Sequence, residues 1–235
     1  MSFLLLIYNE VFYRPLLNGL IFLTTIMPWH DLGLAVVLLT LIIKIVTFPL
    51  MHNMLKTQKT MKLIEPEMKK IYAAKKNKED QAKALMDLYR AHGINPLSGF
   101  FALLIQFPLL LALFQVFQKD IYANQIYIYS FLSIPSNVNT LFVGLVGLDS
   151  PNAAMSFLAA ISQYWQMKLA MPAGSSGPGS GEAQKIMIYV LPVVILVVGF
   201  GMPAAVSLYW TSMNVFAIIH EAAVRRKAMN SGTAS

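Results

Sequence analysis

The sequence predicts an all-α polytopic membrane protein with five transmembrane helices, an outer interfacial helix and a cytoplasmic helical hairpin. Composition is the first reason: 57% of the 235 residues are hydrophobic and 12% are charged, whereas a soluble domain carries about 25% charged residues. Long apolar stretches and an uneven placement of basic residues are the other two. The chain has no cysteine, which excludes disulfides, thiolate metal sites and cysteine nucleophiles.

Residues 1–31 are expected to hold the outer interfacial helix. Within an otherwise apolar segment, Glu10, Arg14, Asn18 and Thr25 recur at spacings of 4, 4 and 7, which places them on one helical stripe. Such an amphipathic helix can lie flat in the membrane interface. The alternative is a sixth span that tolerates a Glu10–Arg14 pair. We favour the interfacial position because a sixth span would also move the N-terminus to the inner side.

The apolar regions then give the spans, since one crossing of about 30 Å needs about 20 apolar residues. The last apolar region is about twice that length, and the Gly-Pro segment "GFGMP" at Gly199–Pro203 divides it. The predicted spans are 32–54, 96–117, 153–171, 186–202 and 204–224.

Charge sets the orientation of these spans. Residues 55–95 hold ten Lys or Arg and five acids, whereas 118–152 hold one basic residue and two acids. Because basic residues gather on the cytoplasmic side, we expect 55–95, the Gly/Ser-rich connector 172–185 and the short tail 225–235 to be cytoplasmic. Residues 118–152 and the N-terminus would then lie outside.

The basic segment 55–95 is itself patterned as two antiparallel helices. Apolar residues recur at helical spacing on both sides of "NKED" at Asn77–Asp80. Asn77 is a suitable N-cap for the second helix, and His92-Gly93 suits its C-terminal end. The sequence therefore predicts a helical hairpin that projects into the cytoplasm.

Lys44 is the exceptional residue of the first span, in "LTLIIKIVTFP". It lies roughly 18 Å into the helix at 1.5 Å per residue, close to mid-depth, where a lysine costs about 2.5–3.5 kcal/mol on insertion scales. One interpretation is that the side chain snorkels to the cytoplasmic interface. The other is that it faces a water-filled cavity, which we favour because its stem reaches only about one helical turn.

Other polar residues fall at similar depth on neighbouring spans, which favours a shared hydrophilic pocket. Ordinary interhelical hydrogen bonding is the alternative. No acid within the spans can pair with Lys44, since Asp31 and Glu221 lie at span ends. The predicted pocket is lined by Lys44, Thr40, Thr47, Gln106, Gln163, Ser207, Trp210, Thr211 and Asn214.

Three segments resemble the YidC family of membrane protein insertases. They read "LAVVLLTLIIKIVTFPLMHNMLKTQKTMKLIEPEMKKI", "HGINPLSGFFALLIQFPLLLALFQVF" and "PVVILVVGFGMPAAVSLYWTSMNVFAII". The resemblance covers about Val11 to Arg226, and its most specific parts are "NPL…LIQFP" and "P…LYW…N" in this order. It implies a five-helix core with an outer interfacial helix and a cytoplasmic hairpin.

The resemblance also implies function. A family member inserts proteins into a bacterial plasma membrane, or an organellar inner membrane, without catalysing a reaction and without a cofactor or metal. It moves short hydrophilic segments through a groove that opens to the cytoplasm and to lipid, and releases helices into lipid. The groove carries one basic residue, usually arginine, which aligns with Lys44. Lysine keeps the charge but loses the planar bidentate fork.

The implied partners are nascent membrane proteins, the lipid bilayer, the ribosome and the general secretion channel, without specific nucleic-acid readout. We expect neither the large extracytoplasmic domain nor the long basic tail found in some relatives. Recruitment would then use the basic hairpin or the short tail. The candidate hairpin residues are Lys56, Lys59, Lys62, Lys69, Lys70, Lys75 and Lys76.

Three other classes of protein remain as alternatives. A small-solute transporter or channel would use the intramembrane Lys and Gln, but the sequence has no inverted repeat and no paired ionisable residues for coupling. An intramembrane enzyme is disfavoured because the four histidines lie at span ends or in the basic loop, without an HExxH motif. A packing subunit of a larger complex would tolerate loss of Lys44.

Overall fold

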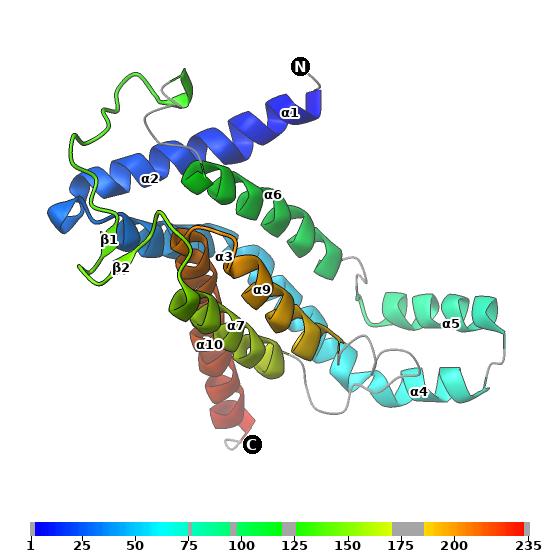
Figure 1. Ribbon diagram of the computed structural model, residues 1–235. Coiled ribbons are helices and arrows are strands. Elements are labelled where there is room, and N and C mark those ends of the chain that lie inside the picture. Colours follow the sequence, from blue (N-terminus) through cyan, green and yellow to red (C-terminus); the bar gives the residue numbers. More distant parts are fainter. Residues whose placement is uncertain (1–2, 75–76, 95–97, 119–125, 171–185, 233–235) are drawn as a thin grey trace.

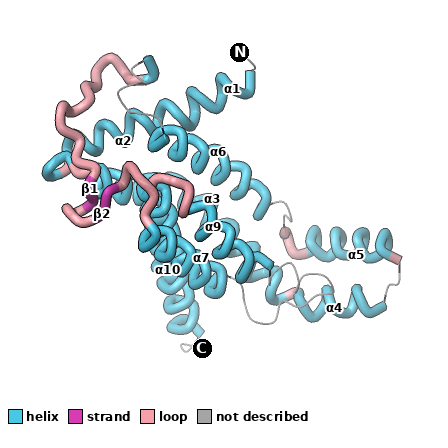
Figure 2. Tube along the Cα trace, viewed as in Figure 1, coloured by secondary structure: helices cyan, strands magenta, loops and turns pink. Residues whose placement is uncertain are grey.

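The computed structural model describes residues 3–74, 77–94, 98–118, 126–170 and 186–232, and most of these residues are helical (Figures 1 and 2). The elements are α1 (Phe3–Tyr8), α2 (Arg14–Ile26), α3 (Leu32–Leu63), α4 (Glu65–Ala74), α5 (Lys78–Ala91), α6 (Ser98–Gln118), β1 (Leu141–Phe142), β2 (Val146–Gly147), α7 (Ala153–Ala170), α9 (Leu191–Gly199) and α10 (Ala204–Gly232).

The N-terminal segment forms one helical rod, in which a π-helical turn at Asn9–Tyr13 joins α1 to α2. In Figure 1 this rod (blue) crosses over α3 and α6 instead of running alongside them. One face of α2 is buried, including Leu17 and Leu20, whereas every residue from Phe3 to Ile7 in α1 is exposed. The rod thus covers one end of the bundle, which we call the α2 end.

The bundle is held together through α10, which packs against α3 on one side and α7 on another, while α7 also packs against α9. The main hydrophobic cluster joins α2, α3, α6 and α10, with Val36, Leu113 and Tyr209 each at most 2% exposed. These residues lie towards the α2 end. Along α3, the last buried side chain of the apolar stretch is Thr40. The tight core therefore ends one turn before Lys44.

Helix α3 continues past the predicted boundary at Met54 and ends at Leu63. Nothing between these residues breaks it, and Pro49 is accommodated inside the helix. The helix is interrupted at Ile64, two residues before Pro66 in α4, because proline has no N–H to continue the helical hydrogen bonds. At 1.5 Å per residue the 32 residues of α3 extend about 48 Å, well beyond the hydrocarbon thickness.

The predicted helical hairpin is α4 and α5. The Asn77 cap is confirmed: its side-chain oxygen accepts a hydrogen bond from the Glu79 N–H at 3.1 Å. The predicted C-terminal end is also confirmed, since α5 stops at Ala91 and Gly93 adopts φ +63°. In the seam between the helices, the Tyr89 hydroxyl lies 4.0 Å from the sulfur of Met68, and burial there raises the pKa of Tyr89.

The sequence did not predict the two-stranded antiparallel sheet, whose register pairs Leu141 with Gly147 and Phe142 with Val146. Its tight turn contains Val143 and Gly144, both with positive φ. The sheet sits at the α2 end, against the start of α3 (Figure 1). The fold is therefore helical with one small hairpin of strands rather than entirely α.

Among the described residues, one stretch is both long and apolar enough to cross a bilayer, Leu32–Pro49 of α3. Shorter apolar stretches lie at Phe107–Phe117 in α6 and Met187–Gly199, which ends with α9. Helix α10 runs on through the predicted span 204–224 into the predicted tail. The predicted connector 172–185 lies outside the described residues.

Candidate functional site

Lys44 is the starting point of the site, thirteen residues into α3. Its side chain is half-buried, between the buried Thr40 one turn before and exposed Ile45 and Val46 directly after. Among the interactions of the described residues, no ion pair or hydrogen bond involves its ammonium group.

The two threonines on its helix differ from each other. Thr40 is completely buried and its hydroxyl donates to the Val36 carbonyl at 2.7 Å. Thr47 is half-buried and donates to the Ile43 carbonyl at 2.8 Å. Both hydroxyls therefore donate to backbone carbonyls of their own helix, but only the Thr47 side chain is partly exposed at the surface of the fold.

A polar network joins α7 to α10. Trp210 donates its indole N–H to the side-chain Oε1 of Gln163 at 2.9 Å, and the side-chain Nε2 of Gln163 donates to the Oε1 of Gln166 at 3.2 Å. Close by in sequence, the Asn214 amide donates to the Ser162 hydroxyl at 3.0 Å. Gln163, Ser162 and Asn214 are each less than 10% exposed. These bonds fasten two helices, as polar residues do in membrane bundles.

Ser207 lies where α7, α9 and α10 meet, in the first turn of α10. A Cβ placed on Gly199 would stand 3.3 Å from the Ser207 hydroxyl and 2.8 Å from the Ser156 hydroxyl. Only glycine therefore permits this close approach. Thr211, one turn further along α10, is half-buried and donates to the Ser207 carbonyl at 2.8 Å.

The structure thus brings two of the predicted pocket residues, Gln163 and Trp210, into direct contact. Sequence reasoning missed their companions Ser162 and Gln166. A signal was present for Gln166, because amides three residues apart on a helix lie on one face. The side chain of Gln106 lies outside the described residues.

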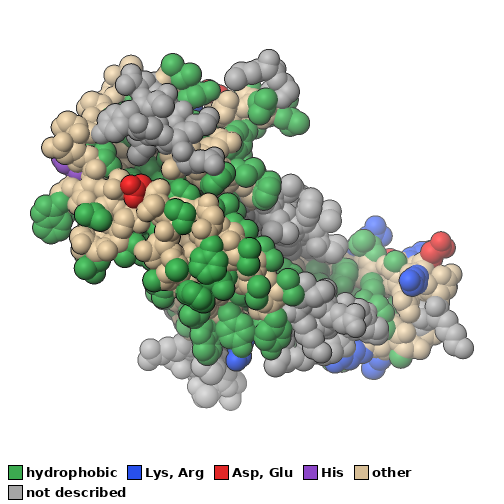
Figure 3. Space-filling model, viewed as in Figure 1, with side chains coloured by type: hydrophobic (Ala, Val, Ile, Leu, Met, Phe, Trp, Pro, Cys, Tyr) green, Lys and Arg blue, Asp and Glu red, His purple; other side chains and the backbone are tan. Residues whose placement is uncertain are grey.

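The predicted recruitment lysines are described in part. Lys69 and Lys70 are exposed on α4, and Lys69 pairs with Glu65 at 2.8 Å. The side chains of Lys56, Lys59, Lys62, Lys75 and Lys76 lie outside the described residues. Basic side chains gather over the α4–α5 hairpin in Figure 3, whereas the visible face of the bundle carries many hydrophobic and few charged side chains.

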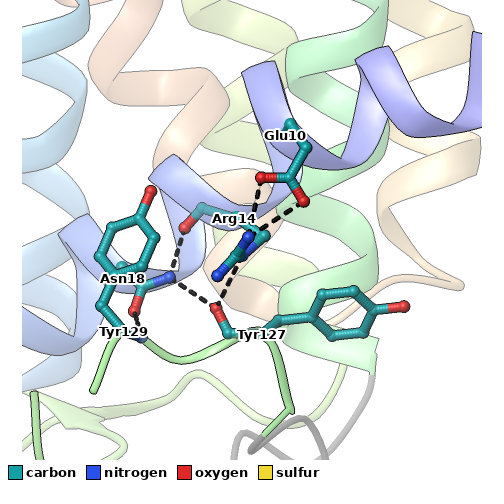
Figure 4. A network of polar contacts seen from close by, with 5 residues as sticks. All are labelled: Glu10, Arg14, Asn18, Tyr127 and Tyr129. Carbon is teal, nitrogen blue, oxygen red and sulfur yellow. Dashed lines mark hydrogen bonds and ion pairs between the residues drawn. The ribbon is translucent and has the colours of Figure 1, made fainter.

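A second polar network lies at the α2 end, and sequence reasoning missed the bonds that link it to the loop (Figure 4). Arg14 forms an ion pair with Glu10 at 2.8 Å, and its guanidinium lies over the Tyr129 ring. Asn18, 2% exposed, donates to the Tyr127 carbonyl at 2.8 Å and accepts from the Tyr129 N–H at 2.7 Å. Two residues of the predicted polar stripe, Arg14 and Asn18, therefore bind a loop, whereas Glu10 stays exposed and Thr25 donates to its own helix.

Asp31 fixes a second part of that loop to the start of α3. One carboxylate oxygen accepts from the N–H groups of Gly33 and Leu34 at 2.7 and 3.0 Å, and the other accepts from Val143 at 2.8 Å. Asp31 is 1% exposed. Loop, rod and helix ends are thus fastened together at the α2 end, while Lys44 lies beyond it.

Comparison with known proteins finds a matching family and relatives that are named membrane protein insertases. The 60Kd inner membrane protein family matches residues 22–231. Membrane protein insertase YidC 2 of Bacillus anthracis is 33% identical over 218 residues, which are 90% of this chain and 78% of that protein. Membrane protein insertase YidC of Fusobacterium nucleatum is 32% identical, over 84% of this chain and 87% of that protein. These names describe membrane insertion rather than a catalysed reaction.

A solved structure agrees on the fold. The crystal structure described as active YidC insertase with the first transmembrane domain resolved aligns with a TM-score of 0.59 at 22% identity. The alignment covers 90% of this chain and 45% of that one. The family match over most of the length, together with relatives above 30% identity, shows that this chain belongs to the 60Kd inner membrane protein family, the YidC family.

Proposed function

We propose that this chain is a membrane protein insertase that moves short hydrophilic segments of its substrates across the bilayer and releases their helices into lipid. The observation that carries the proposal is Lys44: a half-buried cation on the apolar helix α3, just beyond the end of the sealed core. The names of the relatives support the same function. The substrates would be membrane proteins, and the site of action the bacterial inner membrane.

The proposed topology has five spans, built on α3, α6, α7, α9 with the π-helical turn before it, and α10. The N-terminal rod would lie in the outer interface, and the α4–α5 hairpin and the C-terminus in the cytoplasm. The charge pattern supports this orientation, because the basic residues flank the ends remote from the α2 end. A groove would then open towards the cytoplasm beside Lys44 and stay closed at the α2 end.

The proposed mechanism reduces the cost of moving polar groups through hydrocarbon. Water in the groove would shorten the dry path, and Lys44 would attract an acidic residue of the translocated segment. Two opposite charges 4 Å apart attract by about 4 kcal/mol at an effective dielectric constant of 20, against about 1 kcal/mol in bulk water. Transfer of the substrate's apolar helix into lipid would supply the net driving force.

Recruitment of substrates would use the basic α4–α5 hairpin. Its exposed Lys69 and Lys70, with the other predicted lysines, would attract ribosomal RNA or acidic partner surfaces by charge alone. Contacts with the ribosome and the general secretion channel belong to the proposal in this sense. Because this attraction rests on charge, binding of the hairpin to these partners should weaken as the salt concentration rises.

The test is insertion of a single-span substrate with an acidic N-terminal tail by K44A, K44R and K44E variants in proteoliposomes. The attraction in the groove exceeds that in bulk water by about 3 kcal/mol. Losing this excess in K44A would lower insertion by up to about a hundredfold, since 1.4 kcal/mol corresponds to a factor of ten. K44R should retain insertion and K44E should be worse than K44A. If K44E inserts the substrate as well as the parent chain does, attraction by Lys44 is refuted.

A double variant, K44I with I45K, is the matched control. It keeps composition and net charge but moves the ammonium to the neighbouring position, where Ile45 is 64% exposed. We expect it to insert as poorly as K44A, because the charge has left the groove. Uptake of a small solute that depends on Lys44, without any insertion activity, would instead favour a transporter.

A further inference from the structure

The segment between α6 and α7 has an unusual composition for a loop. Residues 121–148 contain no Asp, Glu, Lys, Arg or His over 28 positions, where an average soluble sequence would contain about seven charged residues. Its apolar side chains are not all buried. At the β1–β2 hairpin, Leu141 is 49% exposed, Val143 57% and Leu145 84%. Such a surface is costly in water.

The height of this hairpin relative to the membrane is fixed by its contacts with α3. The Val143 N–H donates to Asp31, the Leu32 N–H donates to the Asn139 carbonyl at 2.9 Å, and Phe142 packs directly on Gly33. These residues begin the stretch Leu32–Pro49, which is long and apolar enough to cross a bilayer. The hairpin is therefore held at the hydrocarbon boundary of the leaflet at the N-terminal end of α3.

The turn of the hairpin carries a second signal. Val143 and Gly144 both have positive φ, 52° and 72°, and the Leu145 N–H closes the turn on the Phe142 carbonyl at 3.0 Å. A β-turn whose two central residues both have positive φ favours Asn, Asp or Gly at these positions, and a β-branched residue is strongly disfavoured there. An apolar side chain at this position suits a tip that contacts hydrocarbon rather than water.

We propose that the hairpin tip, formed by Leu141, Val143 and Leu145, is a lipid-binding surface that dips into the headgroup–acyl boundary of this leaflet. Trp29 extends the surface: it lies two residues before Asp31 and is 80% exposed, and tryptophan is enriched at membrane interfaces. The tip anchors the N-terminal end of α3 at a defined depth. This inference requires that α3 crosses the bilayer but does not depend on the insertase function.

The test uses the natural absence of cysteine. An environment-sensitive fluorophore is attached to a single cysteine in the L145C variant of the full chain, reconstituted in phosphatidylcholine–phosphatidylglycerol vesicles. Lipids carrying a quencher near the headgroup or deep in the acyl chain report the depth. Two labelled variants calibrate the scale: I45C, within the apolar stretch of α3 and 64% exposed, and K83C, exposed on α5.

We expect the L145C probe to emit at shorter wavelength than the K83C probe and to be quenched more by the shallow than by the deep quencher. The I45C probe should show the opposite order. An L145C probe that matches K83C in wavelength and quenching would refute the proposal. A blue-shifted probe that no lipid quenches, and whose shift varies with the protein-to-lipid ratio, would refute it too, because the tip would then contact protein. Leu145 packs against nothing that its loss would unfold, being 84% exposed.

Discussion

Replacing Asp31 by Asn separates two structural roles that one carboxylate performs. Its Oδ1 caps the first turn of α3, and its Oδ2 holds the β1–β2 turn through the Val143 N–H. Asparagine caps a helix about as well as aspartate, but its amide group cannot accept the second bond. A hydrogen bond to a charged group contributes about 1.5–3 kcal/mol. D31N should therefore loosen the hairpin and leave the start of α3 intact.

The measurement is amide hydrogen exchange in detergent or nanodiscs. A loss of about 1.5–3 kcal/mol corresponds to roughly ten- to hundredfold faster exchange at Val143, since 1.4 kcal/mol is tenfold. D31A should speed exchange at Leu34 as well, because the cap adds about 1 kcal/mol. D149N is the matched control: Asp149 is exposed just after the hairpin, and its loss should change neither rate. Unchanged exchange at Val143 in D31N would refute the reasoning.

Three further predictions concern single contacts. G199V should lower the stability of the fold by about 1–3 kcal/mol through overpacking, measured as a lower thermal midpoint. Adding S156G should recover part of this loss, because the Ser156 hydroxyl would lie only 2.8 Å from a Cβ at position 199. N18L removes the bonds to the loop at Tyr129 and should speed proteolysis there, whereas N18D keeps the acceptor and should be milder. N77A should cost α5 about 1 kcal/mol, measured by exchange in its first turn, with N77S close to the parent chain.

The helical hairpin shows what local sequence can predict. Asn77 and Gly93 determine the ends of α5 through their own capping and backbone chemistry, so no distant contact is needed to find them. The end of α3 was harder to predict. The apolar composition of α3 ends where the predicted span ends, but the helix itself continues until its backbone hydrogen bonds are interrupted. Pro66, rather than the change in polarity, determines where this interruption falls.

The contacts at the α2 end could not be predicted because they join distant segments. Asn18 bonds to Tyr129 across 111 positions, and Asp31 to Val143 across 112. Each of these residues has a local explanation as well, a polar stripe on a helix or an N-cap. The second partner is visible only in three dimensions, so the sequence predicted the stripe on the helix but not the bonds of Asn18 to the loop.

Burial and existing hydrogen bonds also reduce the number of predicted residues that can line the proposed groove. A hydroxyl or amide that is buried and already bonded within the bundle cannot solvate a passing segment without breaking that bond, at a cost of about 1–3 kcal/mol. This argument disfavours Thr40, Gln163 and Asn214 as lining residues, since the side chains of all three are hydrogen-bonded and at most 6% exposed. Ser207 is 3% exposed and is disfavoured by its burial alone. Lys44 and Thr47 stay half-buried on α3.

On α10, Trp210 and Thr211 are half-buried as well. We therefore expect T40V to leave insertion unchanged, because the Thr40 hydroxyl serves only its own helix. The T47V variant should reduce insertion of the acidic-tailed substrate, because it replaces a half-buried hydroxyl near Lys44 in the proposed groove with a methyl group. Insertion assays with the two isosteric variants compare the same chemical change at two depths of burial. Equal activity in both variants would remove Thr47 from the groove.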